Sequence, residues 1–182
     1  MRLAHAKGDK DMNALARLGT ARVALTALTG VTALYFALIV FGNVTDYGTN
    51  EQFVVHVLAM DTTFQDPDVM WRAITSPTAV TIAYVLIIAW EAVTALVLVA
   101  AFVAWLRRGG EETARRLSVL GWVMAVLLFG GGFIAIGGEW FQMWQSSKWN
   151  GVEAAFRNVV VASIGLIVAL GGRTRDRSRP LP

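Results

Sequence analysis

One acidic residue, Glu91, lies within a long apolar run, and its position suggests chemistry more directly than that of any other residue. The run covers residues 78–106, and Glu91 is its only charged residue. A carboxylate near the centre of a bilayer costs about 2.5–3.5 kcal/mol on insertion scales, so we expect a protonated acid or an ion paired inside a bundle. Such a group can carry a proton or bind a cation, or it can hold helices together by hydrogen bonds. The sequence leaves both roles open.

Three further charged residues are candidates for the same site. Arg157, near the start of the fourth apolar run, and Arg72, in the segment before the second run, are the predicted partners of Glu91. Glu139 follows the third run and is predicted to form a structural ion pair with Arg157. A pocket made by these four groups would suit a membrane enzyme or a quinone-binding protein, which is the third and weakest functional hypothesis.

His56 and Asp61 are candidate ligand-binding residues in the segment between the first two runs, and Glu51 lies in the same segment. A metal site needs about three convergent ligands, and this spacing shows no convergence, so a packing role is favoured for His56. The chain has no cysteine and 2 histidines. Phosphate-binding, dinucleotide-binding, nucleophilic-serine and zinc-protease motifs are absent from the sequence. We therefore assign no catalytic residue, no metal and no cofactor, although the question of enzymatic activity stays open.

The segment 139–153 is rich in aromatic residues: Trp140, Phe141, Trp144 and Trp149. Indole rings favour the headgroup layer of a membrane, so an interfacial anchor is the favoured interpretation. The alternative is an aromatic surface for a lipid, a quinone-like ring or a partner helix.

These residues must be positioned by membrane-spanning helices. Of the 182 residues, 55% are hydrophobic and only 16% are charged, against about a quarter charged in ordinary soluble domains. Apolar runs predict spans at about 20–43, 78–106, 117–138 and 154–172, each near the length that crosses a bilayer. The predicted fold is all-α: one membrane domain over residues 1–182, a four-helix bundle with external segments 44–77 and 139–153.

The basic residues predict the orientation of the chain. Of the 16 Lys and Arg residues, 13 lie in the N-terminal segment 1–22, the link between the second and third runs, and the tail 173–182. Basic residues in short loops stay in the cytoplasm, so we expect a multi-pass protein of the bacterial cytoplasmic membrane with both termini cytoplasmic. The same rule accounts for the net charge of +3, and no nucleic-acid partner is predicted.

Two short helices are expected in the external segment 44–77. One covers residues 52–60 with an apolar stripe, and the other begins at Asp66-Pro67 and continues through Ile74.

Rows of small residues at intervals of four, such as Gly121 and Ala125, would let helices approach closely.

Several stretches resemble one bacterial family. They are F-G-N-V-T-D-Y-G at 41–48, H-V-L-A-M-D-T-T-F at 56–64, M-W-R-A-I at 70–74, W-E at 90–91, G-G-E-W-F-Q-M-W-Q at 137–145, W-N-G at 149–151 and A-F-R at 155–157. Over about residues 17–172 the chain is similar to the predicted small integral membrane proteins known as domain of unknown function 2165. The resemblance implies a four-helix inner-membrane protein and brings no activity with it.

The sequence supports two main functional hypotheses. The first is a non-enzymatic accessory or scaffold subunit that docks other membrane protein subunits, or a second copy of itself, through small-residue faces and the aromatic segment. The second is a small proton- or cation-coupled carrier that uses Glu91. In both cases the lipid bilayer is a direct partner.

Overall fold

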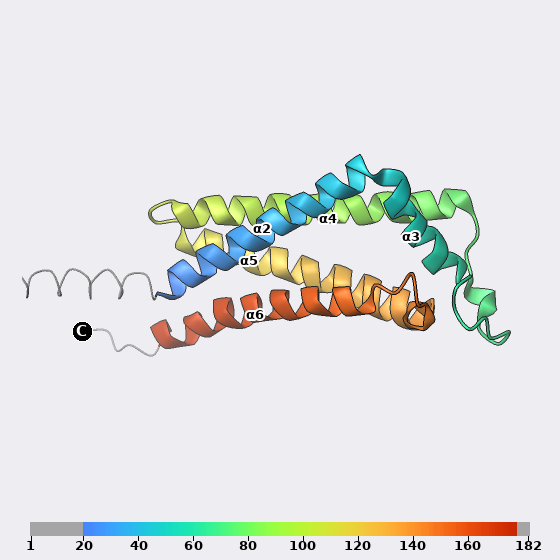
Figure 1. The fold of residues 1–182 in the computed structure, drawn as a ribbon. Helices are drawn as coiled ribbons and strands as arrows, with labels where there is room; N and C mark the ends of the chain where they lie inside the picture. Colours follow the sequence, from blue (N-terminus) through green and yellow to red (C-terminus); the bar gives the residue numbers. More distant parts are fainter. Residues whose placement is uncertain (1–19, 178–182) are drawn as a thin grey trace, which may run out of the picture.

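Four long helices make up the computed structural model, which describes residues 20–177 and their side chains as far as residue 171 (Figure 1). They are α2 (Ala21–Thr45), α4 (Pro77–Leu106), the continuous helix formed by α5 (Glu111–Val126) with η2 (Leu127–Trp140), and α6 (Val152–Arg177). Each is long and apolar enough to cross a membrane. No strand occurs among the described residues, so the predicted all-α class and the four spans are confirmed.

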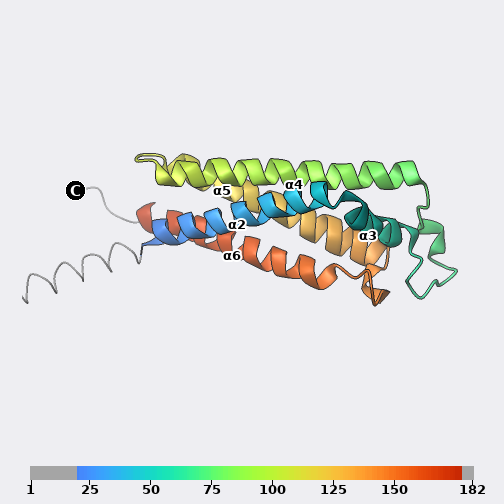
Figure 2. The ribbon, with the colours of Figure 1, turned by 45° about the horizontal axis from the view of Figure 1, so that its top comes forward.

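The long helices run side by side along one axis (Figures 1 and 2). The start of α2, the α4–α5 link and the end of α6 lie together at what we call the terminal end. The short helix α3 (Tyr47–Ala59) and the turns η1 (Met70–Arg72) and η3 (Met143–Gln145) lie at the opposite end, the cap end. At the terminal end, Arg22 pairs with Glu111 at 2.7 Å and also donates to the Trp105 carbonyl oxygen at 3.1 Å.

The third long helix is longer than the charge-free run 117–138 indicates. It begins at Glu111 because the charged residues of the link form its first turn, where the helix dipole favours acidic side chains. From the next turn the Arg116 Nε donates to Glu112 at 2.8 Å, which supports the helical extension.

The cap-end half of this helix is a π-helix. Its last turn closes with the Phe141 amide donating to the carbonyl oxygen of Ile136, five residues earlier, at 3.0 Å. A Cβ atom on Gly138 would lie 3.2 Å from the Val152 side chain, and one on Gly137 would lie 3.3 Å from Met143. The paired glycines therefore let the following turn pack closely against the helix.

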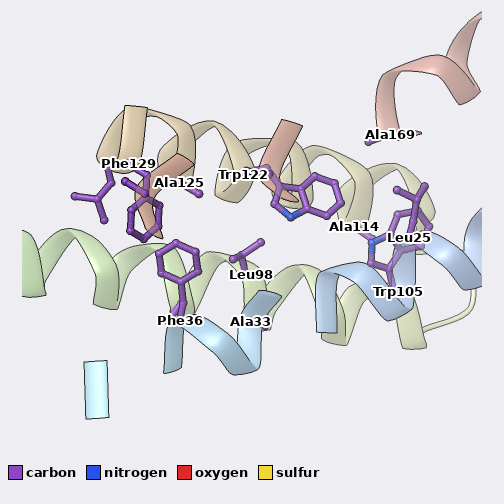
Figure 3. Packing of buried hydrophobic residues seen from close by; sticks show 14 residues of the cluster. Leu25, Ala33, Phe36, Leu98, Trp105, Ala114, Trp122, Ala125, Phe129 and Ala169 are labelled. Carbon is purple, nitrogen blue, oxygen red and sulfur yellow. The ribbon is translucent and has the colours of Figure 1, made fainter. Parts of the chain in front are cut away.

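The core fills the space between the four helices (Figure 3). The rings of Phe36 and Phe129 meet with their centroids 5.9 Å apart, and Leu98 and Trp122 are fully buried toward the terminal end. Buried polar groups in this half are paired, since the Thr29 hydroxyl bonds Ser118 at 3.0 Å. The core in the terminal half of the bundle is thus closely packed, and its buried polar groups have hydrogen-bond partners.

Small residues that recur every four positions are buried in this core. Thr29 and Ala33 of α2, Gly121 and Ala125 of α5, and Ala169 of α6 are all buried. A Cβ on Gly121 would lie 2.5 Å from Leu98, and one on Gly165 would lie 2.6 Å from Trp122. Ala37, one turn further along α2, is exposed. The buried members of these rows therefore serve contacts between the helices of one chain.

The close approach at Gly121 gives a direct test of the packing. Gly121→Ala is expected to lower the free energy of unfolding by about 1–3 kcal/mol relative to Gly42→Ala, because Leu98 is fully enclosed and cannot move aside. The control substitution gains the same helix propensity and has no neighbour within 4 Å. Unfolding by sodium dodecyl sulfate in mixed micelles measures both, and equal stabilities would contradict the packing.

The external segment contains one α-helix and one short 3₁₀ helix where two short helices were expected. The first, α3, begins at Tyr47, five residues before the predicted start. The second is shorter than expected: after Asp66 the chain forms only the 3₁₀ helix η1 and then becomes extended. The Ile74 amide is bonded to the Leu58 carbonyl oxygen at 2.8 Å, and Pro77 disfavours helix just before it, so the turn cannot continue.

Candidate functional site

Glu91 lies at the midpoint of α4 and is 3% exposed. Its Oε2 accepts a hydrogen bond from the Asn43 Nδ2 of α2 at 2.7 Å. No hydrogen bond within residues 20–177 reaches its other carboxylate oxygen, Oε1. The predicted pairing of Glu91 with Arg157 or Arg72 is therefore wrong, and an amide takes the place of the expected cation.

Both arginine side chains have other partners and lie away from Glu91. Arg157 points away from the bundle, because its neighbour Ala155 occupies the inward face of α6, and its side chain is 71% exposed. It pairs with Glu153 at 3.6 Å, so the predicted Glu139–Arg157 pair is also wrong, and Glu139 is exposed at the end of η2. Arg72 donates to the Trp140 carbonyl oxygen at 3.3 Å.

Glu91 faces a cavity of about 280 Å³, which we call the polar chamber. Its polar lining comes from three asparagines, two tyrosines and Glu91, and Glu91 is the one charged group among the lining residues. The polar residues are Tyr35, Asn43, Asn50, Tyr84, Glu91 and Asn158. The chamber reaches from the middle of α4 to Asn50 in α3 and to Gly151 before α6, so it lies in the cap-end half.

Sequence reasoning missed the amide groups of this chamber. Asn43 and Asn158 each lie within the helical part of a predicted span, where an amide is costly unless it is bonded. The available signal was an amide in each of two predicted spans, with Asn43 at the end of span 20–43 and Asn158 near the start of span 154–172. Which helix faces they occupied could not be inferred, because the surrounding residues are apolar on every side.

The short helix α3 covers one side of the chamber with Asn50 and Phe53. It is fixed to α4 by the Tyr47 and Tyr84 rings, whose centroids are 4.8 Å apart. Glu51 accepts from the Thr81 hydroxyl at 3.1 Å and from Tyr47 at 3.3 Å. Partial burial, and then the negative charge of Glu51, raise the pKa of the Tyr47 phenol, which keeps it a hydrogen-bond donor.

The comparisons with known proteins identify the family. The model of the predicted small integral membrane proteins, domain of unknown function 2165, matches residues 21–170. The chain belongs to this family. No curated protein and no solved structure matches it. The match covers the first three long helices, α6 as far as residue 170, and the segments 44–77 and 139–153, and it carries no activity.

In this family member, His56 is satisfied by its neighbours. Its Nδ1 lies 2.8 Å from Asp61, and its ring stacks on Trp149 with the centroids 4.5 Å apart. Over the part of the chain that the structure describes, no group of three metal-ligating side chains occurs. His56 and Asp61 thus connect the end of α3 to the turn before α6, outside the polar chamber.

The aromatic residues of the segment 139–153 do not form one surface in this family member. Trp140 is 46% exposed and Trp144 is 47% exposed, whereas Phe141 is 5% exposed and Trp149 lies under His56. Phe141 turns inward because the π-helix ends at Trp140 and the chain reverses direction there. The exposed pair suits a membrane interface, and the inward pair packs the cap.

Proposed function

We propose that this integral membrane protein binds a proton or a small cation at Glu91 and acts as a small carrier. The observation that carries the proposal is the carboxyl group of Glu91, buried at the midpoint of a spanning helix and directed into a polar chamber. A membrane helix tolerates such a group when the group has a function or is fully satisfied. Here one amide bonds it, and Oε1 has no hydrogen-bond partner among the described residues.

The electrostatics of the chamber favour a positively charged occupant. An ionised Glu91 leaves one negative charge with no basic side chain in the lining. A proton or a single cation neutralises it, and the asparagine carbonyl oxygens offer further acceptors for a cation or its water molecules. The volume of about 280 Å³ exceeds the roughly 10–15 Å³ that one water molecule needs, so a hydrated ion has room.

We place access to the chamber at the cap end. The chamber reaches Asn50 and Gly151 at that end, while Leu98, Trp105 and Trp122 close the other half of the bundle. A carrier alternates access to such a site by rearranging one side at a time. On the distribution of basic residues, we place both termini in the cytoplasm of a bacterium and the cap on the outer face of the inner membrane.

The accessory-subunit hypothesis has less support from the contacts. It depended on small-residue faces for docking, and Thr29, Ala33, Gly121 and Ala125 are buried within the chain itself. The aromatic segment is likewise divided between the surface and the cap. A purely structural role for Glu91 would account for its hydrogen bond to Asn43 but not for the Oε1 atom, which has no hydrogen-bond partner among the described residues.

Glu91→Gln tests the proposal in liposomes. Wild-type protein, reconstituted with a trapped pH indicator or cation indicator, is expected to carry proton or cation flux above that of protein-free vesicles. The amide keeps the size and the hydrogen bond to Asn43 but cannot ionise, so flux is expected to fall to the protein-free level. Glu139→Gln is the matched control, because Glu139 is exposed, and it is expected to keep wild-type flux.

Two results would overturn the carrier. One is flux unchanged in Glu91→Gln. The other is absence of flux from wild-type protein together with a stoichiometric complex that co-purifies from native membranes and is kept by Glu91→Gln, which would establish the accessory role.

A further inference from the structure

A second cavity, the apolar pocket, lies beside the polar chamber. It measures about 270 Å³ and lies between α3, α4, η2 and the turn that follows, and side chains without charge or hydrogen-bonding groups line it. Among them Leu86 of α4 and Ile136 of η2 are exposed on the outside of the bundle. That outside surface faces hydrocarbon in a membrane, so the pocket is accessible to a lipid-like chain.

The two cavities share a wall. Phe53, Val54, Ile87 and Phe133 line both of them, so a single layer of side chains separates the apolar pocket from the polar chamber. Phe53 and Phe133 form a stacked pair in this wall, with ring centroids 6.3 Å apart. Rotation of aromatic side chains, without movement of a helix, would connect the two spaces.

We infer that the two cavities together bind a single-chain amphiphile, with its protonated amine against Glu91 in the polar chamber and its hydrocarbon chain in the apolar pocket. The inference rests on the proposed cation site at Glu91 and names the class of cation. Each cavity approaches the lower limit of ligand pockets, about 300 Å³, and the two together fall within the usual range.

The chemistry of each cavity selects one end of the ligand. In the chamber, an ammonium group donates to the Oε1 of Glu91 and to asparagine carbonyl oxygens. An anionic head group would be repelled by the Glu91 carboxylate. In the pocket, a hydrocarbon chain leaves no polar group unsatisfied, and water would find no partner there. A small hydrophilic cation would use the chamber and leave the adjoining pocket without a role.

Photolabelling of the full-length protein in lipid nanodiscs tests the inference. The probe is dodecylamine that carries a diazirine in its chain, and the labelled residues are mapped by mass spectrometry. We expect labels on pocket residues such as Leu128, Phe141 and Met143. Unlabelled dodecylamine should suppress them at a concentration about tenfold lower than dodecanol, because the alcohol lacks the charge-assisted hydrogen bond.

Substitutions on either side of the wall provide the controls. Glu91→Gln should remove the advantage of the amine over the alcohol. Ala83→Phe should fill the pocket and abolish the pocket labels, whereas Ala89→Phe, at an exposed position on the same helix, should keep them. Gly132→Val is a second filling variant, since a Cβ there meets only the Leu128 side chain at 3.9 Å.

The outcomes separate this inference from the carrier proposal. Labels spread evenly over the lipid-facing helices, or equal suppression by amine and alcohol, would overturn the amphiphile while cation flux through Glu91 could still stand. Pocket labels that depend on Glu91 without any cation flux would support the amphiphile site and count against transport of small cations.

Discussion

Trp122→Ala is expected to lower the free energy of unfolding by about 3 kcal/mol, as the largest buried side chain of α5 leaves a cavity. This is the lower end of the range for tryptophan truncations in soluble cores. In a membrane the surrounding lipid is as apolar as the core, so the cavity and the lost packing contribute but transfer from water does not. Trp122 also donates from Nε1 to the Thr32 hydroxyl at 3.3 Å, and this bond would be lost.

Unfolding by sodium dodecyl sulfate in mixed micelles measures this loss. The matched control is Trp144→Ala, which removes an indole that is about half exposed at the cap end and should change stability by less than about 1 kcal/mol. A further comparison uses Gly165→Ala, whose new methyl group clashes with the Trp122 ring at 2.6 Å. In the Trp122→Ala background that clash disappears, so the glycine substitution should become harmless. A similar cost in both backgrounds would contradict the α5–α6 contact.

Asn43→Leu is expected to destabilise the protein by about 1–3 kcal/mol, because a buried carboxyl group loses its hydrogen-bond donor. The change concerns the bond between Asn43 Nδ2 and Glu91 Oε2, since the backbone carbonyl of Asn43 still accepts from the Tyr84 hydroxyl. Thermal unfolding in detergent measures the effect. Asn158→Leu is the control: it makes the same substitution in the same chamber, and within residues 20–177 Asn158 has no hydrogen bond to Glu91.

A double-mutant cycle with Glu91→Leu isolates this bond. When both partners become apolar, no buried polar group is left unsatisfied, so the double variant should be close to wild-type stability. The two single losses should therefore not add, with a coupling of at least about 0.5 kcal/mol. Additive losses would mean that Asn43 stabilises the fold independently of the carboxyl group.

The number and approximate length of the helices followed from sequence because lipid imposes a simple requirement. A backbone in hydrocarbon must bond itself, so a run such as 78–106 has to be a helix of bilayer-crossing length. The same run placed Glu91 at membrane depth without any knowledge of its neighbours. The charged first turn of α5 fell outside the prediction, because charge ends an apolar run but does not end a helix.

The contacts of Glu91 could not be inferred in this way. A buried carboxylate pairs more strongly with an arginine than with an amide, so an arginine was the predicted partner of Glu91. The structure instead places Asn43 beside Glu91, since Arg157 lies on the outward face of α6. The division of the aromatic segment depended similarly on where the π-helix ends, at Trp140. Neither feature has a local sequence signal.

The sequence by itself determined that the chain has four helices long and apolar enough to cross a membrane and that one of them carries an acid near its midpoint. Only the tertiary structure decided which helix faces meet, which amide bonds Glu91, and that a polar and an apolar cavity adjoin. The physical reason is that lipid and protein core are equally apolar. A membrane helix therefore carries no amphipathic stripe to mark its inward face, and close packing and hydrogen bonding alone choose it.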